Sequence, residues 1–513
     1  MAQANEYFAL TNPIRKITGK SPDELTREDL VNIIIDQGIE RITFHYTALD
    51  GKVKELRIPV CNRAQVETIL AEGERVDGSS LFKGIVDAGK SDLYVIPVYK
   101  SAFFNPFDEA SIDFMCRFID KDGNLAEFAP DNVLLKAARL LNEKTGFELY
   151  ALGELEFYLL GHPEDELFPP EKQKGYHSGA PFVKNGEALN EMLRYITQIC
   201  GNVKYAHNEV GSMEVVVSDL PELDGKRAEQ VEIEFLPVPI EDAADHLVLA
   251  KWIIRNVAYN YGYAVTFVPK LETGHAGNGM HVHMMLRKDG RNALVDGGEL
   301  NENAKKLIGG LSHYAPSLTA FGNTVAGSYL RLVPHQEAPT NVCWSAMNRS
   351  ALIRVPLGWS NVENLADIVN PGRSEKIENP DSRQTVELRS PDGSAHTHFL
   401  LAGITMAAEW GLANPDFALE IADRCHVEGN IHDHGTENLD QLATSCAESA
   451  EKLIKDRSLY VRDGIFTDRM IDHMAELLRK ENDKELNKRL MSLPEAEKLD
   501  ESRRIMHRDL HKH

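Results

Sequence analysis

Alternating polar and apolar positions in the first quarter of the chain predict a small β-rich domain. The stretches RITFHYTA (41–48) and VKELRIPV (53–60) alternate on either side of LDGK, and an Asp-Gly pair between two such stretches is a strong hairpin signal. A further stretch, DLYVIPVY (92–99), is flanked by turn residues and predicts another strand. We expect this domain to end near residue 128.

Downstream, strand patterns alternate with amphipathic helices. The first helix is predicted with Asp131 or Asn132 as its N-cap and Gly146 as its stop. Long helical patterns follow at 241–262 and 395–412. The strand patterns are GELEFYLL (153–160), VKYAHNEVGSMEVVV (203–217), QVEIEFLP (230–237), AVTFVPK (264–270), GMHVHMML (279–286) and TVELRSP (385–391). This mixture predicts an α+β fold.

The end of the chain, from about residue 437, is helical in pattern and heavily charged. We interpret it as a docking helix or a solvated tail. We therefore expect two domains, an N-terminal domain of residues 1–128 and a larger domain of residues 129–513 that includes this C-terminal helical extension.

Composition narrows the classes of function. The chain has 513 residues, of which 42% are hydrophobic, and its net charge of −23 argues against a nucleic-acid partner or an anionic membrane surface. The six cysteines are far apart and form no Cys-x-x-Cys pair, so reduced thiols are the simpler interpretation. The sequence contains neither an apolar signal segment nor an apolar run long enough for a membrane span, and we expect a cytoplasmic protein.

The segment AGNGMHVHMML (276–286) places two histidines two residues apart in a predicted strand. Side chains at this spacing point to the same face, so His281 and His283 project together. They could bind a cation or a phosphate, or they could simply be two satisfied histidines on a half-buried strand.

The same spacing recurs on other predicted strands. Glu154 and Glu156 form one such pair, Glu232 and Glu234 another, and Glu387 is paired with Arg389. So many charges on buried strands would be costly unless divalent cations neutralised them. Ligand sets of mostly carboxylates with one imidazole favour magnesium or manganese over zinc, and these ions commonly accompany phosphate chemistry.

Cationic partners for anions are also present. Arg331, Arg349, Arg354 and Arg389 lie in a segment that is otherwise rich in apolar residues, and guanidinium groups there suit phosphates or carboxylates. The chain has no GxxxxGK[ST] loop, which excludes a P-loop nucleotide site, and the glycines at 277–279 do not form a Rossmann fingerprint.

Taken together and in order, eight motifs resemble those of the glutamine synthetase family, in particular its bacterial and archaeal type I form. They span most of the chain, and as a set they are highly specific. The motifs are VDGSS (76–80), GELEF (153–157), HNEV (207–210), EQVEIEF (229–235), GNGMHVHM (277–284), SYLRLVPHQEAP (328–339), SAMNRSALIRVP (345–356) and VELRSPD (386–392).

The resemblance implies a fold and an assembly. The N-terminal domain would be a β-grasp domain, and the rest a catalytic domain in which a curved antiparallel sheet forms a funnel. Family members assemble as stacked rings, so we expect a homo-oligomer, namely a dodecamer of two hexameric rings. One subunit would contribute the DGSS segment to its neighbour's funnel, and an isolated monomer would be inactive.

The resemblance also assigns roles to individual residues. One Mg²⁺ or Mn²⁺ would be bound by Glu156, Glu209 and Glu232, and a second by Glu154, His281 and Glu387. The remaining roles are His283 for the nucleotide phosphates, Arg331, Arg389 and the loop at Gly277 for the amino-acid substrate, Arg349 and Arg354 for the transferring phosphoryl group, Asp77 as the base that deprotonates ammonium, and Glu337 as the flap carboxylate that shields the intermediate.

The implied reaction is ATP-dependent ligation of glutamate and ammonium. A carboxylate is a poor electrophile, so ATP first phosphorylates it, and the resulting γ-glutamyl phosphate must meet ammonia before water. Two alternatives stay open: a γ-glutamyl ligase for another amine or a ligase for another acid, and a non-catalytic homologue that keeps the assembly. Lost metal glutamates would favour the second, and none is clearly lost.

Two departures from the family pattern concern the substrate sites. Where the family has an asparagine that contacts glutamate, this chain has Ala276. Where the family has an arginine two residues before the metal-binding glutamate, this chain has Thr385, and Arg383 is a candidate substitute.

Two further departures concern spacing and regulation. The residues GSMEVVVSDLPELDGKRA (211–228) separate Glu209 from Glu232, which are close together in the family, and we interpret them as an extended hairpin. An alternative alignment pairs Glu209 with Glu214, but the sequence that follows Glu232 favours Glu232. The tyrosine that is adenylylated in some bacterial enzymes would fall near His432, so we expect that control to be absent.

Overall fold

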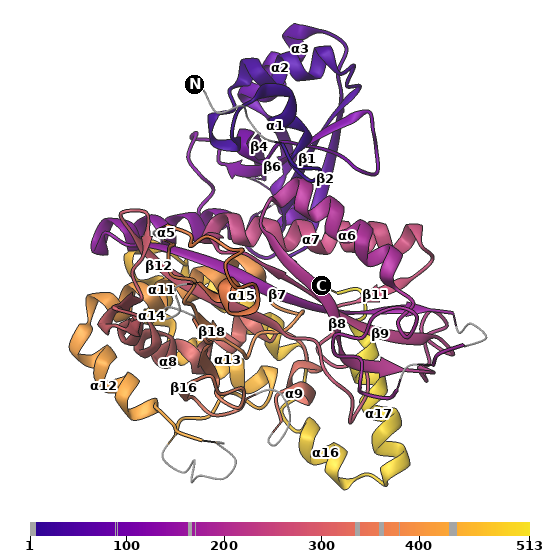
Figure 1. Ribbon diagram of the computed structural model, residues 1–513, viewed down its shortest axis with the longest axis vertical. Helices are drawn as coiled ribbons and strands as arrows, with labels where there is room; N and C mark the ends of the chain where they lie inside the picture. Colours follow the sequence, from indigo (N-terminus) through magenta and orange to yellow (C-terminus); the bar gives the residue numbers. More distant parts are fainter. Residues whose placement is uncertain are drawn as a thin grey trace.

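Two large β-sheets, a two-stranded sheet of β14 (Val295–Asp296) and β15 (Glu299–Leu300), and the helices packed around them make up the described part of the protein (Figure 1). The computed structural model describes residues 7–512 except for 88, 90, 163–166, 170, 334–338, 359–363, 379 and 430–438. Helices α5, α6 and α7 form a band that separates the N-terminal sheet from the larger one (Figure 1). The α+β class predicted from the sequence is confirmed.

The N-terminal sheet has six strands in the order β2-β1-β6-β4-β3, with β5 paired to β6. The predicted hairpin is confirmed, because β1 and β2 are antiparallel neighbours, whereas β1 and β6 are parallel. The strands are β1 (Arg41–Thr47), β2 (Val53–Pro59), β3 (Glu74–Asp77), β4 (Asp92–Pro97), β5 (Phe103–Phe104) and β6 (Ser111–Ile119). The helices of this region are α1 (Pro13–Thr18), α2 (Arg27–Asp36), α3 (Arg63–Glu72) and α4 (Gly78–Leu81), with short 3-10 turns at Pro22–Glu24 and Tyr99–Ser101.

The larger sheet has ten strands in the order β16-β17-β18-β12-β7-β9-β8, with β10 and β11 paired to β7 and β13 paired to β12. Its strands pair antiparallel except for β16 and β17, which are parallel, so the expected antiparallel sheet is in fact mixed at this edge. The strands are β7 (Glu148–Gly161), β8 (Val203–Met213), β9 (Arg227–Phe235), β10 (Val238–Pro239), β11 (Ala264–Thr266), β12 (Met280–Lys288), β13 (Arg291–Asn292), β16 (Trp344–Ala346), β17 (Ile353–Val355) and β18 (Val386–Leu388).

Helix α5 (Pro130–Thr145) ends at Gly146 in the left-handed conformation, as predicted. Its start differs from the prediction, because Pro130 occupies the first turn and neither Asp131 nor Asn132 caps it. Proline suits the first turn since its missing N–H would be unpaired there. The Asn132 side chain instead donates to the carbonyls of Phe118 and Ala126.

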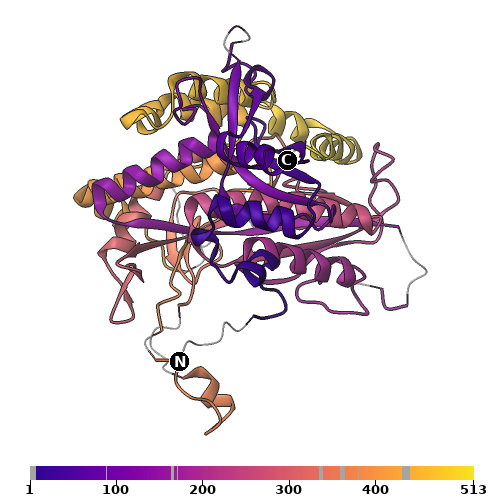
Figure 2. The same ribbon diagram turned by 90° about the horizontal axis from the view of Figure 1, so that it is seen from above.

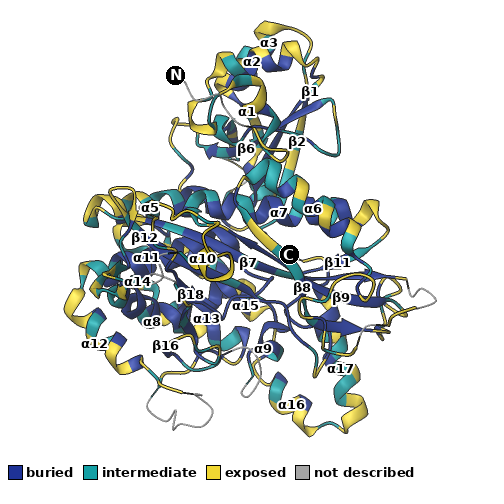
Figure 3. Ribbon diagram, in the orientation of Figure 1, coloured by how far each residue is buried: buried dark blue, intermediate teal, exposed yellow. Residues whose placement is uncertain are grey.

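Apolar helices cover the outer face of the larger sheet. Gly153 of β7 approaches Leu247 of α7 so closely that an added Cβ would lie 2.7 Å from the leucine side chain. One continuous hydrophobic cluster runs from Phe114 of β6 to Leu152 of β7, and Figure 3 shows that the central strands are mostly buried. The helices downstream of α5 are α6 (Gly186–Cys200), α7 (Ile240–Asn260), α8 (Glu302–Gly322), α9 (Ser328–Arg331), α10 (Leu365–Val369), α11 (Thr397–Ala413) and α12 (Pro415–Cys425).

The C-terminal region is helical, as predicted, and it docks on the body of the protein. The yellow helix α17 runs beside the larger sheet and ends near β11 (Figure 1), and Figure 2 shows the C-terminal helices gathered along one side of the molecule. These helices are α13 (Cys446–Lys455), α14 (Arg457–Val461), α15 (Asp468–Arg479), α16 (Leu486–Ser492) and α17 (Glu495–Arg508). The described part of the chain contains no helix that is long and apolar enough to cross a membrane.

The expected extended hairpin between Glu209 and Glu232 has shorter strands than predicted. Strands β8 and β9 are antiparallel neighbours, but β8 ends at Met213, and residues 214–226 form an irregular connection. Gly225 adopts a left-handed conformation there, and its N–H donates to the carbonyl of Val216. The Val216 N–H also donates to the carbonyl of Lys226 over 2.7 Å, so main-chain pairing continues at this one residue of the apolar run although β8 has ended.

Candidate active site

Charged side chains on adjacent strands of the larger sheet share its inner face. Antiparallel register places His281 of β12 opposite Glu154 of β7, and Glu154 opposite Glu234 of β9. Two residues further along β7, Glu156 lies opposite Glu232 of β9. Because side chains alternate along each strand, the spacing of two that was seen in the sequence brings these groups together.

These side chains line a cavity of about 1750 Å³. The predicted arginines Arg331, Arg349, Arg354 and Arg389 lie in its wall, as do Ala276 and Gly277. The structure therefore brings the predicted carboxylates, imidazoles and guanidinium groups from distant parts of the sequence to one place.

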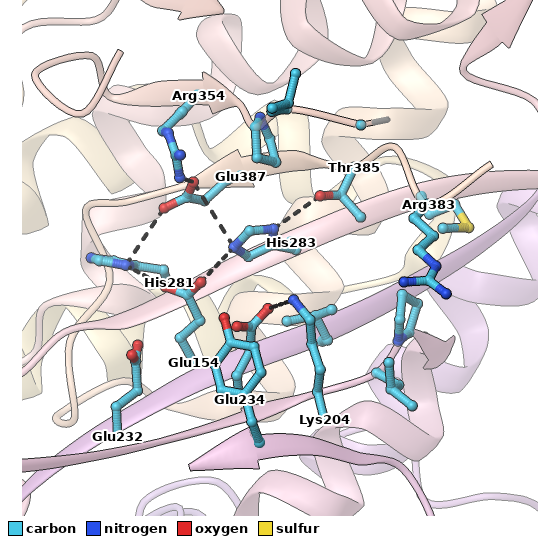
Figure 4. Close-up of a pocket in the computed structure, with 18 of the residues that line it drawn as sticks. Glu154, Lys204, Glu232, Glu234, His281, His283, Arg354, Arg383, Thr385 and Glu387 are labelled. Atoms are coloured by element: carbon cyan, nitrogen blue, oxygen red, sulfur yellow. Dashed lines mark hydrogen bonds and ion pairs between the residues drawn. The ribbon is translucent and has the colours of Figure 1, made fainter. Parts of the chain in front are cut away.

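The first cluster consists of Glu154, His281 and Glu387, whose candidate ligand atoms lie within 4.8 Å of one another. His281 Nδ1 lies 2.8 Å from Glu154 Oε2 and 3.5 Å from Glu387 Oε1 (Figure 4). These are the three residues that the sequence grouped together. Carboxylate oxygens and an imidazole nitrogen converging in this way form a donor set that suits Mg²⁺ or Mn²⁺.

The second cluster consists of His207, Glu209 and Glu232, again with candidate ligand atoms within 4.8 Å. His207 Nε2 lies 2.9 Å from Glu232 Oε2. The sequence reasoning grouped Glu209 and Glu232 but missed His207. The signal was available, because His207 and Glu209 are two apart on one predicted strand.

Glu156 lies beside the second cluster. Gly279 N–H donates to Glu156 Oε2 over 2.8 Å. Burial raises the pKa of Glu156 well above its usual range, and repulsion from Glu232 and Glu209 adds to this effect. The alternative that pairs Glu209 with Glu214 is not supported, because Glu214 follows the end of β8 and is exposed.

Repulsion among the carboxylates makes this face a candidate cation site. Burial raises the pKa of Glu232 well above its usual range, and the charges of Glu154 and Glu209 raise it further. Glu234 differs, since Lys204 Nζ lies 2.6 Å from its Oε1 and neutralises it within the chain (Figure 4). Glu156, whose pKa is raised by burial and by repulsion from Glu232 and Glu209, would gain from a cationic ligand, and a divalent metal ion fits that need.

His283 contacts the first cluster from one side. Its Nε2 lies 2.9 Å from Glu154 Oε1, and its Nδ1 lies 2.9 Å from the Thr385 hydroxyl oxygen (Figure 4). Burial lowers the pKa of His283, but attraction to Glu154 and Glu387 outweighs this effect and raises it to about 9. Thr385, which stands where the family has an arginine, therefore holds this imidazole.

Two of the four cavity arginines pair with Glu387. Arg354 Nη1 lies 2.8 Å from Glu387 Oε2, and Arg389 Nε lies 3.1 Å from Glu387 Oε1. Arg331 Nη1 donates to the carbonyl of Ser390 over 3.0 Å. Arg349 is hydrogen bonded to the hydroxyl of Tyr176, a cavity residue that the sequence reasoning did not single out.

Ala276 and Arg383, at or near positions that depart from the family pattern, both lie in the cavity wall. The N–H of Ala276 donates to Gln173 over 2.8 Å, and its carbonyl accepts from the Tyr158 hydroxyl over 2.7 Å, so both of its main-chain groups already have partners. Arg383 lies in the cavity wall, apart from the first cluster (Figure 4).

Of three further predicted positions, the structure describes only Asp77. Asp77 does not line the cavity of its own chain; it caps α4, and its carboxylate accepts hydrogen bonds from Ser79 and Ser80. These bonds lower the pKa of Asp77 to about 2, so it is ionised at neutral pH. Glu337 and the segment around His432 lie outside the described residues.

Comparison with known proteins gives matches along most of the chain. Residues 38–121 match the family model "Glutamine synthetase, beta-Grasp domain", and residues 127–492 match "Glutamine synthetase, catalytic domain". A glutamine synthetase of Pyrococcus furiosus is 32% identical over 433 residues, which cover 82% of this chain and 86% of that protein. One of Mycolicibacterium smegmatis is 28% identical over 487 residues, which cover 88% and 94%.

Solved structures share the fold. The structure "CryoEM Plasmodium falciparum glutamine synthetase" has a TM-score of 0.70 and 19% sequence identity, and the match covers 92% of this chain and 98% of that one. The structure "GmaS/ADP complex-Conformation 1" has a TM-score of 0.69 and 20% identity, with 91% and 98% covered.

Proposed function

The chain belongs to the glutamine synthetase family of ATP-dependent carbon–nitrogen ligases, and from this premise we propose that it joins glutamate and ammonium to form glutamine. The reaction would pass through γ-glutamyl phosphate. Transfer of the γ-phosphoryl group of ATP to the side-chain carboxylate makes phosphate a leaving group, which ammonia then displaces.

One observation carries the proposal: two clusters of carboxylates with imidazoles lie in the same cavity as four arginines. Repulsion among Glu156, Glu209 and Glu232 favours a bound cation, and the guanidinium groups suit anionic substrates. Glutamate and ATP supply the anions, and divalent metals supply the cations. A site that must bring two negatively charged substrates together needs both kinds of group.

We assign one Mg²⁺ or Mn²⁺ to Glu154, His281 and Glu387, and a second to Glu209 and Glu232 with Glu156 beside them. His207 is an additional candidate ligand of the second ion. Bound there, the two ions would offset the charge of the ATP phosphates during phosphoryl transfer. The protein's part is to hold the ligands on a rigid sheet so that this charge distribution is preformed.

The arginines would orient the substrates. Arg331 lies against Gly277, whose added Cβ would be 3.2 Å from Arg331 Cγ, and with Arg389 it would hold the carboxylates of glutamate. Arg349 and Arg354 would neutralise the transferring phosphoryl group, and His283 would contact the nucleotide phosphates. Guanidinium groups suit both tasks because they pair with two oxygens at once.

The remaining groups would come from a neighbouring subunit and from the flap. Asp77, ionised and outside its own cavity, would enter a neighbour's site in the ring assembly and attract ammonium there. Glu337 would shield the intermediate from water. Both roles, and the dodecamer of two hexameric rings, belong to this proposal.

A direct assay tests the reaction. Purified protein is given ATP, Mg²⁺, glutamate and ammonium, and phosphate release and glutamine are both measured. We expect release that requires glutamate and ammonium together and that stops with EDTA. If no ammonium concentration gave glutamate-dependent turnover, the proposed reaction would be wrong.

Ala276 favours a second candidate, a ligase for another amine or another acid. Its side chain offers no polar atom to the site, and both of its main-chain groups are already bonded to Gln173 and Tyr158. A panel of primary amines and of dicarboxylic acids in the same assay separates the two candidates. A primary amine that greatly outperforms ammonium would change the assigned acceptor.

A further inference from the structure

Two segments of this chain have no part in the proposed chemistry. One is the connection between β8 and β9, residues 214–226, and the other is the C-terminal segment, which comprises α17 and residues 509–512. They lie far apart in the sequence. In the structure they pack against each other and against residues 269–279, which we call the substrate loop because Ala276 and Gly277 line the cavity.

A small hydrophobic cluster joins the two segments. Leu510, only 4% exposed, packs in this cluster with Val216 and Leu223 of the connection and Leu271 of the substrate loop. The cluster is separate from the main core. Its other members come from β7, from β8 and β9 and their connection, and from residues 264–271, so docking of the C-terminal segment through Leu510 completes the cluster.

His507 bonds to both neighbours at once. Its Nε2 lies 2.9 Å from the carbonyl oxygen of Leu271, and its Nδ1 lies 2.9 Å from the hydroxyl oxygen of Ser218. A carbonyl only accepts, so Nε2 carries the proton and Nδ1 accepts from the hydroxyl. Burial lowers the pKa of His507, which keeps the imidazole in this neutral form.

Arg503 contacts the substrate loop at Glu272, the residue that follows Leu271. Its Nε lies 2.7 Å from Glu272 Oε2, and the two side chains are only 19% and 11% exposed. Its neighbour Arg504 makes a similar contact of 2.9 Å to Asp219, but those side chains are 62% and 73% exposed. The contact to the substrate loop is thus shielded from water, and the contact to the connection is not.

The substrate loop lies between these contacts and the cavity. Its base is closed by Asn278 N–H, which donates to the carbonyl of Pro269 over 2.9 Å. Gly277 is pressed between that carbonyl and the Arg331 side chain. One side of the loop therefore faces the substrate arginine, while the other side, at Leu271 and Glu272, is held by α17.

We propose that the C-terminal segment and residues 214–226 act as a brace, in which Arg503 and His507 are positioning residues that fix the substrate loop and so set the affinity for the acid substrate. The link to the acid rests on the proposed function of the loop. The brace itself is independent of it. Neither residue touches the cavity, so their effect passes through Leu271 and Glu272.

Hydrogen exchange tests the brace without reference to activity. In the full-length protein, Arg503→Ala and His507→Ala should speed amide exchange in a peptide covering 269–279 and leave a peptide from β12 unchanged. Arg504→Ala is the matched control, because it removes the same residue type from the same helix but only an exposed contact to Asp219. It should exchange like the parent.

Steady-state kinetics tests the consequence. Arg503→Ala and His507→Ala should raise KM for the acid by roughly three- to thirtyfold, the usual range for residues that act at a distance, while kcat and the Kd for ATP stay within about twofold. Arg503→Lys and His507→Gln keep a donor in place and should recover most of the affinity. A thermal scan checks that each variant is folded.

The outcomes are distinguishable. Unchanged exchange at 269–279 in both alanine variants would overturn the brace, whatever the enzyme's substrate is. Faster exchange with unchanged KM for the acid would overturn its link to affinity. If the parent failed to use glutamate but the variants still loosened the loop, the proposed reaction would fail and the brace would stand.

Discussion

At the scale of single residues, the inner face of the larger sheet concentrates negative charge where water is largely excluded. Glu232 lies near Glu154, Glu156 and Glu209, and its pKa is raised by burial and by repulsion from its neighbours. In a site without metal this repulsion costs stability. Metal ions would therefore contribute to folding as well as to chemistry.

Glu232→Gln should reduce the stabilisation that metal provides. In the parent, EDTA should lower Tm by on the order of a few degrees relative to saturating Mg²⁺, because an ion that binds only the folded state stabilises it. The variant should show a smaller shift, and its metal-free form should be at least as stable as the metal-free parent since one repelling charge is gone.

Glu229→Gln is the control for that experiment. Glu229 lies on the same strand, but the main-chain N–H of Lys184 donates to its carboxylate, and Arg227 lies 3.3 Å away. It does not line the large cavity. An equal loss of the metal-dependent shift in both variants would contradict the assignment of Glu232.

Lys251 should make stability depend on pH. It is buried on α7, where its ammonium donates to the carbonyl of Gly393 over 2.8 Å. Burial lowers the pKa of Lys251 from 10.5 to about 7, and the nearby charge of Arg255 contributes. The folded chain then binds fewer protons than the unfolded chain above pH 7, so this lysine's contribution to the unfolding free energy rises with pH up to about 10.

Comparing the parent with Lys251→Met isolates that contribution. The variant keeps the length of the side chain and removes the charge, so it should be the more stable protein at pH 7, by an amount on the order of 1 kcal/mol or more that shrinks by pH 9. Urea unfolding at both pH values measures the difference. A difference that is the same at pH 7 and pH 9 would contradict the lowered pKa.

At the scale of elements, the strands that carry alternating charge were predictable. The patterns at 153–160 and 230–237 fall in β7 and β9, and each places its glutamates on the inner face. The pattern at 279–286 became β12. In these strands the local alternation and the tertiary structure agree, because one face packs on helices and the other faces the cavity.

Other features depend on contacts that local patterns do not encode. The apolar run at 215–217 has the pattern of a strand. In the structure, however, Val216 packs in the small hydrophobic cluster with Leu510, almost three hundred residues away in sequence. His207 joins the second cluster because the register places it opposite Glu232. The parallel pairing of β16 with β17 likewise follows from sheet assembly and not from either strand.

A buried ion-pair network ties the N-terminal sheet to three helices. Arg117 of β6 lies 2.6 Å from Asp245 of α7 and 3.6 Å from Asp131 of α5. His398 of α11 lies 3.0 Å from the other oxygen of Asp245. Burial raises the pKa of Asp245, but Arg117 and His398 outweigh this effect and hold it well below its usual range.

Asp245→Asn should destabilise the protein by about 3–5 kcal/mol, because it leaves the Arg117 charge buried with a weaker partner. Since the pKa of Asp245 is lower in the folded chain, its contribution is complete above about pH 4 and declines as the pH falls further. Urea unfolding at pH 7 measures the loss. Glu451→Gln, which breaks an exposed pair with Lys484, should cost less than about 1 kcal/mol.

At the scale of the whole molecule, one group of the proposed mechanism is out of place. Asp77 sits at the end of β3 in the N-terminal sheet, is exposed, and does not line the cavity of its own chain. Its carboxylate is ionised and held by Ser79 and Ser80, so it is prepared to attract a cation. If it acts in the reaction, it must act on another subunit's cavity.

Asp77→Asn should therefore leave ATP binding intact and lower the rate of glutamine formation by on the order of a hundredfold or more, as is typical when one acid-base group is lost. The change keeps the size of the side chain and one accepting oxygen for the Ser79 N–H, and it removes the charge. Nucleotide titration and a thermal scan separate lost chemistry from lost structure. A variant that assembles, binds ATP and makes glutamine at the parent rate would remove Asp77 from the mechanism.

Mixing two inactive variants tests whether the site is shared. Asp77→Asn retains an intact cavity, and Glu232→Gln retains an intact Asp77. If each site combines the cavity of one subunit with Asp77 of the next, mixed rings contain sites in which both parts are native. Equal mixing should restore about a quarter of the parent activity. Each site takes its cavity from one subunit and Asp77 from the next, and each of these two parts is native in about half of the cases. Separate rings of each variant that are mixed without exchange of subunits should stay inactive. If co-assembled rings, verified to contain both chains, also stayed inactive, Asp77 would not act across the subunit boundary.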